Sequence, residues 1–283
     1  MTEIKKLVTA AWNSRKITDY LRGELRLSVS LIKKVKFGGV FINGENVHMR
    51  ALVYEGDEVL VNLPEDSSEN IRAIPMPLDI VYEDDYFIAV NKPTGMPTHP
   101  SKGNSLPTLA EGIMAHFCNK KFVFRAINRL DRDTSGIIII AKDAHTANSL
   151  SAEMKAGGYV KKYVGLVAGI PTPPAGIINA PIERECDGSI KRIVRPDGKH
   201  ALTEYRVIKE LGDGNSICEI MLHTGRTHQI RVHMAYIGHP LLADFLYGER
   251  IEGESYKLHA KYIEFTHPAT KERIKLMTKA DFE

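Results

Sequence analysis

Residues 128–141 read Asn-Arg-Leu-Asp-Arg-Asp-Thr-Ser-Gly-Ile-Ile-Ile-Ile-Ala, a dense polar run followed at once by an apolar one. Four consecutive isoleucines without polar alternation predict a strand buried on both faces of a sheet. The polar half has the composition of a turn, because Asp, Thr, Ser and Gly all favour turns. Polar groups held directly against a buried strand are also rigid enough to bind or to react. Composition alone leaves both readings of the loop open.

On either side of this segment, strand-like patterns outnumber helix-like ones. Two strands around an acidic turn are predicted over 78–90, and helices over 108–117, 144–156 and 228–237. Further strands are predicted at 137–141, 160–168, 201–209, 216–222, 258–265 and 272–277. Because strands and helices do not alternate strictly, we predict an α+β fold with a mixed or antiparallel sheet, and not a doubly wound one.

The overall composition excludes several classes of protein. With 283 residues, 43% of them hydrophobic, the chain is long enough for two domains with real cores. No apolar stretch approaches the roughly 18 residues of a membrane helix, and residues 1–11 lack the apolar core of a signal peptide. The three cysteines are widely spaced, so neither a disulfide framework nor a zinc site is expected. We expect a cytoplasmic protein that does not associate with membranes.

The charge of the chain is concentrated at its N-terminus. Residues 1–62 hold 10 Lys+Arg and 7 Asp+Glu, whereas the remaining residues hold 28 of each. The acidic, aperiodic segment 63–77 reads as a linker, so we predict an N-terminal domain over 1–62 and a larger domain over 78–283. A basic module joined to a neutral body suggests attachment to a polyanion, although a solvated helical face would give the same excess.

Local patterns within 1–62 predict two helices, a hairpin and a last strand. Ile17, Tyr20 and Leu21 follow helical spacing, and Ser28 or Ser30 can cap a second helix. The hairpin is predicted over 40–47 with an Asn-Gly turn, and the strand over 56–61. This order resembles the alpha-L domain, a small RNA-binding domain first known from a small-subunit ribosomal protein. The resemblance implies that a basic face contacts RNA phosphates, with Lys33, Lys34 and Lys36 as the candidate contacts.

Four ordered motifs in the larger domain resemble the RNA pseudouridine synthases of the RluA/RluD branch. The central one is Arg-Leu-Asp-x-x-Thr-Ser-Gly at 129–136. The others are Val-Tyr-Glu-Asp at 81–84 with Asn-Lys-Pro-x-Gly at 91–95, Lys-Lys-Tyr-Val-Gly-Leu-Val-Ala-Gly at 161–169, and Thr-Gly-Arg-Thr-His-Gln-Ile-Arg-Val-His-Met at 224–234. The match runs from about residue 78 to 270. It implies an isomerase that converts uridine to pseudouridine in RNA and contributes to RNA modification.

The resemblance also implies roles for three catalytic residues. Asp131 matches the aspartate that attacks the target uridine, at the sugar or at the base. Tyr163 matches the tyrosine that stacks on the flipped base, although a tyrosine in a strand is otherwise a core residue. Arg231 matches the arginine that pairs with the aspartate, and a cation there would keep the carboxylate ionised.

Other residues are expected to bind RNA or to support the loop. Arg129 matches an arginine that occupies the space left by the flipped base, while Arg226 and Lys92 are candidate phosphate contacts. Asn128 stands where the family usually has His, and an amide can neither carry charge nor shuttle a proton. We expect it to support the active loop structurally, together with Thr134, Ser135 and Gly136.

Two other interpretations fit parts of the sequence. Residues 131–134 also fit the Asp-x-Asp-x-Thr pattern of Mg²⁺-dependent haloacid-dehalogenase-type phosphatases, but those need an apolar strand before the first Asp, and residues 124–130 are rich in arginine. An inactive RNA-binding protein on a synthase scaffold has only Asn128 in its favour. The spacing of His228, His233 and His239 places no two on one helical face, so we expect polar packing or RNA contacts from them and no metal.

We therefore expect a cofactor-free RNA pseudouridine synthase that acts as a monomer. Isomerisation is redox-neutral, and the sequence holds no glycine-rich nucleotide loop and no metal-ligand cluster. Large-subunit rRNA is the favoured substrate, because family members with an N-terminal RNA-binding domain often act there, and tRNA is the alternative.

Overall fold

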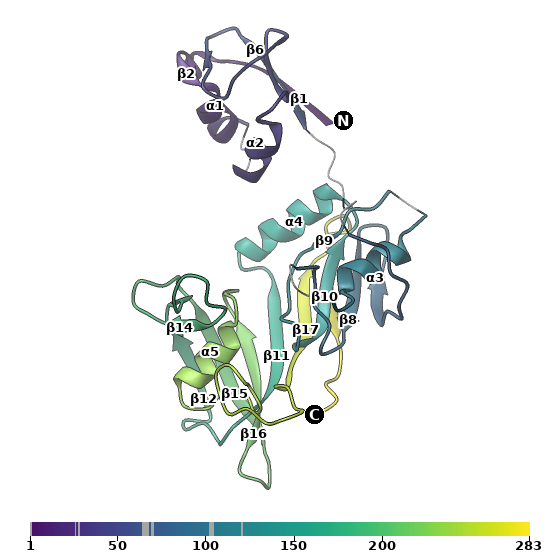
Figure 1. Ribbon diagram of the computed structural model, residues 1–283, viewed down its shortest axis with the longest axis vertical. Coiled ribbons are helices and arrows are strands. Elements are labelled where there is room, and N and C mark those ends of the chain that lie inside the picture. Colours follow the sequence, from purple (N-terminus) through teal and green to yellow (C-terminus); the bar gives the residue numbers. More distant parts are fainter. Residues whose placement is uncertain are drawn as a thin grey trace. The chain divides into compact units, whose positions relative to one another are not determined.

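A computed structural model of the chain describes residues 2–25, 27, 29–63, 68, 71–101, 105–119 and 121–283. The chain divides into two compact units, Met1–Ser67 and Ser68–Glu283, each of which is described by itself (Figure 1). Of the predicted linker 63–77, residues 64–67, 69 and 70 lie outside the described part of the chain. No helix among the described residues is long and apolar enough to cross a membrane.

The first unit is a small α+β body with its own core. Four strands form an antiparallel sheet in the order β1 (Thr2–Leu7), β6 (Glu58–Leu63), β3 (Val40–Ile42) and β4 (Glu45–Asn46). A second pair joins β2 (Arg15–Lys16) to β5 (Leu52–Val53), beside the short helices η1 (Ala10–Trp12), α1 (Ile17–Gly23) and α2 (Val29–Val35).

Most of the predicted elements of this unit are present. Helix α1 buries Ile17, Tyr20 and Leu21 as the spacing predicts. Asn43 and Gly44 both have positive φ, 51° and 84°, as a type I′ hairpin turn requires. The predicted cap Ser28 and the side chain of Ser30 lie outside the described residues. Strand β1 was not predicted, because its lysines and glutamate do not alternate cleanly with its apolar residues.

The second unit is built on one ten-stranded sheet. Its continuous order is β12 (Ala175–Asn179), β15 (Leu202–Glu210), β16 (Ser216–Leu222), β11 (Val160–Val167), β17 (Leu258–Thr266), β10 (Ser135–Ala141), β8 (Phe87–Lys92) and β7 (Ile80–Glu83). Strand β18 (Arg273–Met277) pairs with β17, and β9 (Arg125–Ala126) pairs with β10. A separate pair joins β13 (Ile182–Arg184) to β14 (Arg192–Val194). The predicted α+β class with a mixed sheet is confirmed.

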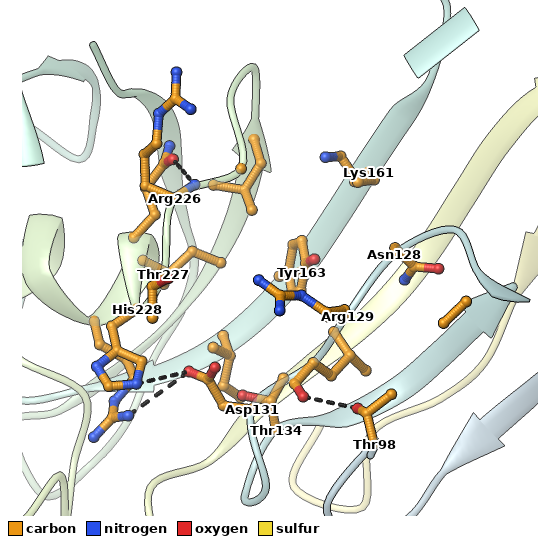
Figure 2. A pocket seen from close by; sticks show the side chains of 18 of the residues that line it. Thr98, Asn128, Arg129, Asp131, Thr134, Lys161, Tyr163, Arg226, Thr227 and His228 are labelled. Carbon is orange, nitrogen blue, oxygen red and sulfur yellow. Dashed lines mark hydrogen bonds and ion pairs between the residues drawn. The ribbon is translucent and has the colours of Figure 1, made fainter. Parts of the chain in front are cut away.

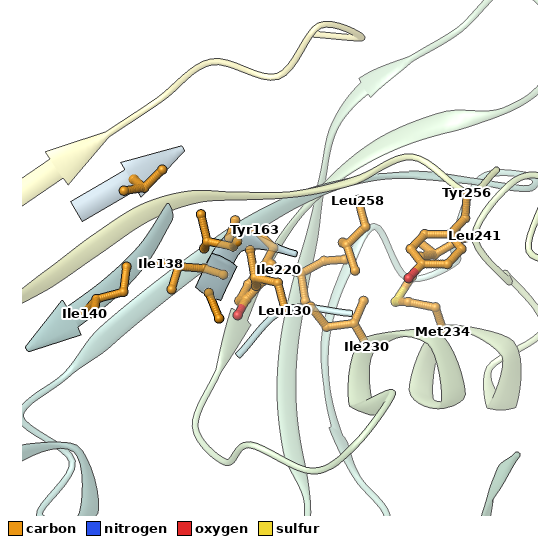
Figure 3. Close-up of a cluster of buried hydrophobic side chains, with 14 of the residues drawn as sticks. Leu130, Ile138, Ile140, Tyr163, Ile220, Ile230, Met234, Leu241, Tyr256 and Leu258 are labelled. Carbon is orange, nitrogen blue, oxygen red and sulfur yellow. The ribbon is translucent and has the colours of Figure 1, made fainter. Parts of the chain in front are cut away.

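The isoleucine run lies in the interior of this sheet. Ile138 and Ile140 pack into one core cluster, which also holds residues of α3 (Leu109–His116) and α5 (Gln229–Tyr236), as Figure 3 shows for Ile230 and Met234. Ile137 and Ile139 pack into a different cluster with Leu150 of α4 (Ala144–Lys155). The strand is therefore buried on both faces, as four isoleucines in succession predict.

Gly136 permits the one parallel pairing among the described strands. Strands β10 and β17 run parallel at Ser135–His259 and Gly136–Ala260. A Cβ atom on Gly136 would lie 2.4 Å from the carbonyl oxygen of Ala260, and its φ of 110° is open mainly to glycine. A backbone approach this close requires glycine, and it places the loop before β10 next to the start of β17.

Candidate active site

A cavity of about 630 Å³ opens where three elements meet: the loop before β10, the strand β11 and the start of α5 (Figure 2). Seven of the predicted site residues line it, namely Asn128, Arg129, Asp131, Thr134, Tyr163, Arg226 and Arg231. These residues come from positions as far apart as 128 and 231, so the fold brings together what the motifs separated in sequence.

The loop that carries Asp131 is held through its carbonyl oxygens. Thr98 Oγ1 donates to Leu130 O at 2.9 Å, and Thr94 Oγ1 donates to Asp133 O at 2.8 Å. Lys92 Nζ donates to Arg132 O at 2.9 Å. Three side chains from one stretch of chain thus fix three carbonyls of the loop, which leaves the Asp131 side chain on a rigid support.

The prediction that Lys92 contacts RNA phosphate is wrong. Its side chain is fully buried, and its remaining two donors go to the carbonyls of Pro93 and Met96, each at 2.8 Å. Burial lowers the pKa of Lys92 to about 8, against the opposing effect of Asp133 and Asp131, so the ammonium remains charged at neutral pH. Lys92 is therefore an internal brace of the loop.

The residues around Asp131 that were predicted as supports have internal partners. Asn128 is 7% exposed, donates to Ile137 O at 2.9 Å and accepts from Ile139 N at 2.9 Å, which joins the loop to β10. Thr134 Oγ1 lies 3.2 Å from Tyr256 Oη, and Ser135 Oγ lies 2.9 Å from His259 Nδ1. An amide serves the two Asn128 bonds fully, since it offers a donor and an acceptor at once.

The Asp131 carboxylate faces a cation that is itself fixed from behind. Arg231 Nη1 lies 3.7 Å from Asp131 Oδ2, while its Nε and Nη2 each donate to Asp244 at 2.7 Å. Asp244 is fully buried and Arg231 is 4% exposed. Burial alone would lower the pKa of Arg231, but the hydrogen bonds and charge of Asp244 raise it above its ordinary value. A paired fork of this kind has one orientation only.

Three aromatic rings, those of Phe245, Tyr247 and Tyr256, lie near the Arg231 guanidinium, and the two tyrosines are the nearer ones. The Arg231 Cζ atom lies 4.3 Å from the centre of the Tyr256 ring and 4.9 Å from that of Tyr247. Such contacts stabilise a desolvated cation by about 2 kcal/mol. The third nitrogen of the fork is thereby left directed towards Asp131.

His228 also faces Asp131, a position that the sequence did not predict. Its Nε2 lies 3.8 Å from Asp131 Oδ2, and Figure 2 shows the two side chains opposite each other. Burial has the largest effect on the pKa of His228 and lowers it. The charge of Asp131 raises this pKa and that of Arg231 lowers it. Because the net result is a pKa below the ordinary value, the imidazole is neutral at pH 7. His233 and His239 show the expected polar packing, against Ala180 O and Ala168 O respectively, each at 2.9 Å.

Strand β11 contributes a tyrosine and a lysine to the same cavity. Tyr163 is 6% exposed, and burial together with the charge of Asp131 raises its pKa, so its phenol stays protonated. Lys161 lies two residues earlier, which places it on the same side of the strand. Burial lowers the pKa of Lys161, and within the described part of the chain no carboxylate pairs with it.

The two exposed arginines occupy different parts of the cavity. Arg226 lies at the end far from Asp131, where its Nε donates to His200 O at 2.8 Å (Figure 2). Arg129 is exposed at the rim of the cavity. Burial lowers the pKa of the nearby His99, and the positive charge of Arg129 lowers it further. Lys33, Lys34 and Lys36 belong to the first unit, where all three are exposed on or just after α2.

Sequence reasoning missed Asp244, Tyr247, Tyr256 and Lys161 in this site. One sequence signal was available for Asp244, because it is an acidic residue directly after the apolar run Leu241–Ala243. A carboxylate at the end of such a run is buried more often than one in a polar loop, and a buried carboxylate requires a partner. The tyrosines carry no comparable signal.

Comparison with known proteins gives a consistent result. Residues 86–236 match the family model for RNA pseudouridylate synthase. YjbO of Bacillus subtilis, called an uncharacterized RNA pseudouridine synthase, is 40% identical over 259 residues, or 89% of this chain and 91% of the relative. Ribosomal large subunit pseudouridine synthase D of Pseudomonas aeruginosa is 33% identical over 85% of this chain and 80% of its own length. The solved structure of human RNA pseudouridylate synthase domain containing 1 covers 73% of this chain and 85% of its own, with 27% identity and a TM-score of 0.62.

Proposed function

The chain belongs to the RNA pseudouridylate synthase family, and we propose that Asp131 is the nucleophile with which it isomerises uridine in large-subunit rRNA. The arrangement that carries this proposal is the Asp131 carboxylate at the cavity, faced at 3.7 Å by Arg231, which buried Asp244 holds in one orientation. A nucleophilic carboxylate must be ionised, and a fixed cation beside it favours the ionised form.

The reaction sets clear demands on the site. The N1–C1′ bond breaks, the uracil turns, a C5–C1′ bond forms, C5 loses its proton and N1 gains one. Asp131 attacks either carbon 1′ or the base, and both routes use the same carboxylate. Tyr163 supplies a ring face for the flipped base and a hydroxyl donor, because its raised pKa excludes it as a base at neutral pH.

Three cations around the cavity are proposed to hold the flipped nucleotide. Arg129 at the rim and Arg226 at the far end line the same cavity as Tyr163. Lys161 is a partly buried cation with no carboxylate partner in the described residues, so an anionic or carbonyl oxygen of the substrate is its natural counterpart. These contacts position the nucleotide and do not read its sequence.

The first unit is proposed to be an RNA-binding domain of the alpha-L type. Lys33, Lys34 and Lys36 present three exposed ammonium groups within four residues. Such a cluster releases counterions from RNA and so contributes affinity that depends strongly on salt. The proposed substrate is large-subunit rRNA, since relatives with 33% and 34% identity are named for the large ribosomal subunit. tRNA is the second candidate.

The test is tritium release from RNA labelled at uridine carbon 5, with rRNA and tRNA assayed separately. Asp131→Asn should abolish release and leave RNA affinity within about tenfold, because Asp131 contributes to chemistry and not to phosphate binding. Asp197→Asn is the matched control, since the Asp197 side chain is 70% exposed and, among the described residues, Arg195 is its one ion-pair partner.

Each outcome has a definite meaning. Release from rRNA alone by the wild-type protein supports the proposed substrate, and release from tRNA alone replaces it. Full activity of Asp131→Asn would remove Asp131 as nucleophile. Tight RNA binding by the wild-type protein without release from either RNA would favour an inactive RNA-binding protein.

A further inference from the structure

We propose that His228 is a positioning residue that directs an Nε2–H at Asp131, and that the Tyr247 hydroxyl sets this tautomer by donating to His228 Nδ1. The inference rests on the proposed role of Asp131 as nucleophile. It concerns residues that the comparison with the family does not assign, and it follows from the hydrogen-bond geometry behind the site.

The backbone of His228 is the first observation. Its φ of 57° and ψ of 20° place it in the left-handed region immediately before α5. For a non-glycine residue this conformation costs about 1–2 kcal/mol, and strain of this kind is concentrated at functional sites. A glycine or asparagine would satisfy this turn at lower cost, so the backbone alone does not explain the presence of histidine.

The tautomer follows from the hydrogen bonds of Tyr247. The backbone N–H of Arg192 donates to Tyr247 Oη at 2.9 Å, so the tyrosine oxygen acts as an acceptor there. The hydroxyl keeps its own proton, and His228 Nδ1 lies 2.8 Å away. No other acceptor for this proton is found in the described residues. Tyr247 therefore donates to Nδ1, and a neutral imidazole that accepts at Nδ1 carries its proton on Nε2.

That Nε2–H faces the nucleophile. Nε2 lies 3.8 Å from Asp131 Oδ2, the same oxygen that Arg231 Nη1 approaches at 3.7 Å. Contacts of this length in a ligand-free site commonly shorten once substrate is bound. Two N–H groups on Oδ2 fix the rotation of the carboxylate, so Oδ1 becomes the oxygen directed to the substrate.

One buried residue organises both of these donors. Asp244 holds Arg231, and its Oδ1 also accepts from the backbone N–H groups of Leu246 and Tyr247 at 3.0 and 3.3 Å. The turn that Asp244 stabilises is the turn that brings Tyr247 to His228. The two partners of Asp131 are thus set by a common support.

The charge of His228 is determined by five facing groups. Arg231 and Arg192 oppose its protonation, Asp131 and Asp244 favour it, and Tyr247 occupies Nδ1. With burial as the largest effect, the pKa falls below its ordinary value and the ring is neutral at pH 7. A second proton on Nδ1 would break the bond from Tyr247 and place a positive charge beside the nucleophile. Activity should therefore fall as the pH drops through this lowered pKa.

Two substitutions at His228 separate positioning from a purely structural role. The amide N–H of His228→Gln reaches about as far as Nε2, so it can still donate to Asp131 but cannot titrate. His228→Asn suits the left-handed backbone better, but its amide stops short of Asp131. We expect kcat of the Gln variant to exceed that of the Asn variant at least tenfold with similar KM, although the Asn variant should melt at the higher temperature. The acid limb of the pH profile should disappear in the Gln variant.

A measurement on the full-length protein without RNA tests the tautomer directly. ¹⁵N-histidine labelling should show one ring with a protonated Nε2 and a hydrogen-bonded, unprotonated Nδ1, and this ring is assigned by its absence in His228→Gln. In Tyr247→Phe, which keeps the ring below Arg231, the Nδ1 signal should shift and kcat should fall about tenfold or more.

These readouts separate the inference from the proposed function. A protonated Nδ1 on His228 in the wild-type protein overturns the inference whatever the activity. Equal or higher kcat in the Asn variant than in the Gln variant does the same, since it leaves only a backbone role. If the tautomer is as expected but Asp131→Asn stays active, the proposed nucleophile is wrong and the positioning role falls with it.

Discussion

At the scale of single residues, the site is a carboxylate whose surroundings are built before substrate arrives. Asp131, Tyr163 and Arg231 could be placed in one cavity from their motifs, and the structure brings them together. The motifs could not reveal which carboxylate holds Arg231, because Asp244 lies 13 residues away across an irregular turn. Lys92 illustrates the opposite failure: a motif indicates that a lysine is needed but not whether its ammonium faces RNA or the interior.

Asp244→Asn should both destabilise the protein and slow the reaction. Breaking a buried ion pair by removing one charge costs about 3–5 kcal/mol, because the remaining cation is left unpaired. We expect the free energy of unfolding in urea to fall by this amount and kcat to fall at least about 100-fold, as Arg231 loses its orientation. The exposed pair Arg195–Asp197 is the control, and Asp197→Asn should change stability by less than about 1 kcal/mol. Similar losses at both positions would contradict the role given to Asp244.

At the scale of elements, long and strongly patterned segments were predictable, whereas several short strands were not. Strands β10, β11, β15 and β16 and helices α3–α5 lie close to their predicted bounds, because apolar periodicity is a strong signal over seven or more residues. Strands β12, β13 and β14, which were not predicted, have only five, three and three residues, and β12 carries the exposed apolar residue Ile177. Tertiary pairing, and not local pattern, defines such strands.

Gly136→Ala should disrupt the sheet beyond the effect of backbone strain alone. The new Cβ would lie 2.4 Å from Ala260 O, and the φ of 110° adds its own penalty. We expect a loss of about 3 kcal/mol or more in urea unfolding. Gly188→Ala is the matched control, since Gly188 has a φ of 81° but nothing within 4 Å of its Cβ position. This control should lose only about 1 kcal/mol. Equal losses would mean that the close approach to β17 is not what demands glycine.

At the scale of the whole molecule, the net positive charge and the candidate active site belong to different units. The basic excess lies within residues 1–62, while the residues that line the candidate active site all belong to the second unit. The division of the chain into a basic and a neutral part could be predicted, because the net charge of a segment is read directly from its sequence and does not depend on tertiary contacts.

Replacing Lys33, Lys34 and Lys36 with Gln should weaken RNA binding without affecting chemistry. Each lost phosphate contact reduces the slope of log affinity against log salt by about 0.7–0.9, so three should reduce it by about 2–3. Single-turnover rates at saturating protein should be unchanged. The same three charges removed at exposed Lys209, Lys275 and Lys279 of the second unit provide the control. An equal loss of slope in both triple variants would show a general charge effect and no dedicated RNA-binding face.

The order of strands in the large sheet has a consequence for the time at which the enzyme can first act. Strand β17 lies between β11 and β10, yet it leaves the ribosome after nearly all of the other strands. Until then the two halves of the sheet have no strand to join them, and Ser135 lacks its partner His259, 124 residues further on. Contacts of such long range form slowly. Once Asp131 has been made, the growing chain therefore carries this proposed nucleophile on a half-built sheet until residues 258–266 follow. We expect catalytic competence to begin only when this last central strand has been inserted.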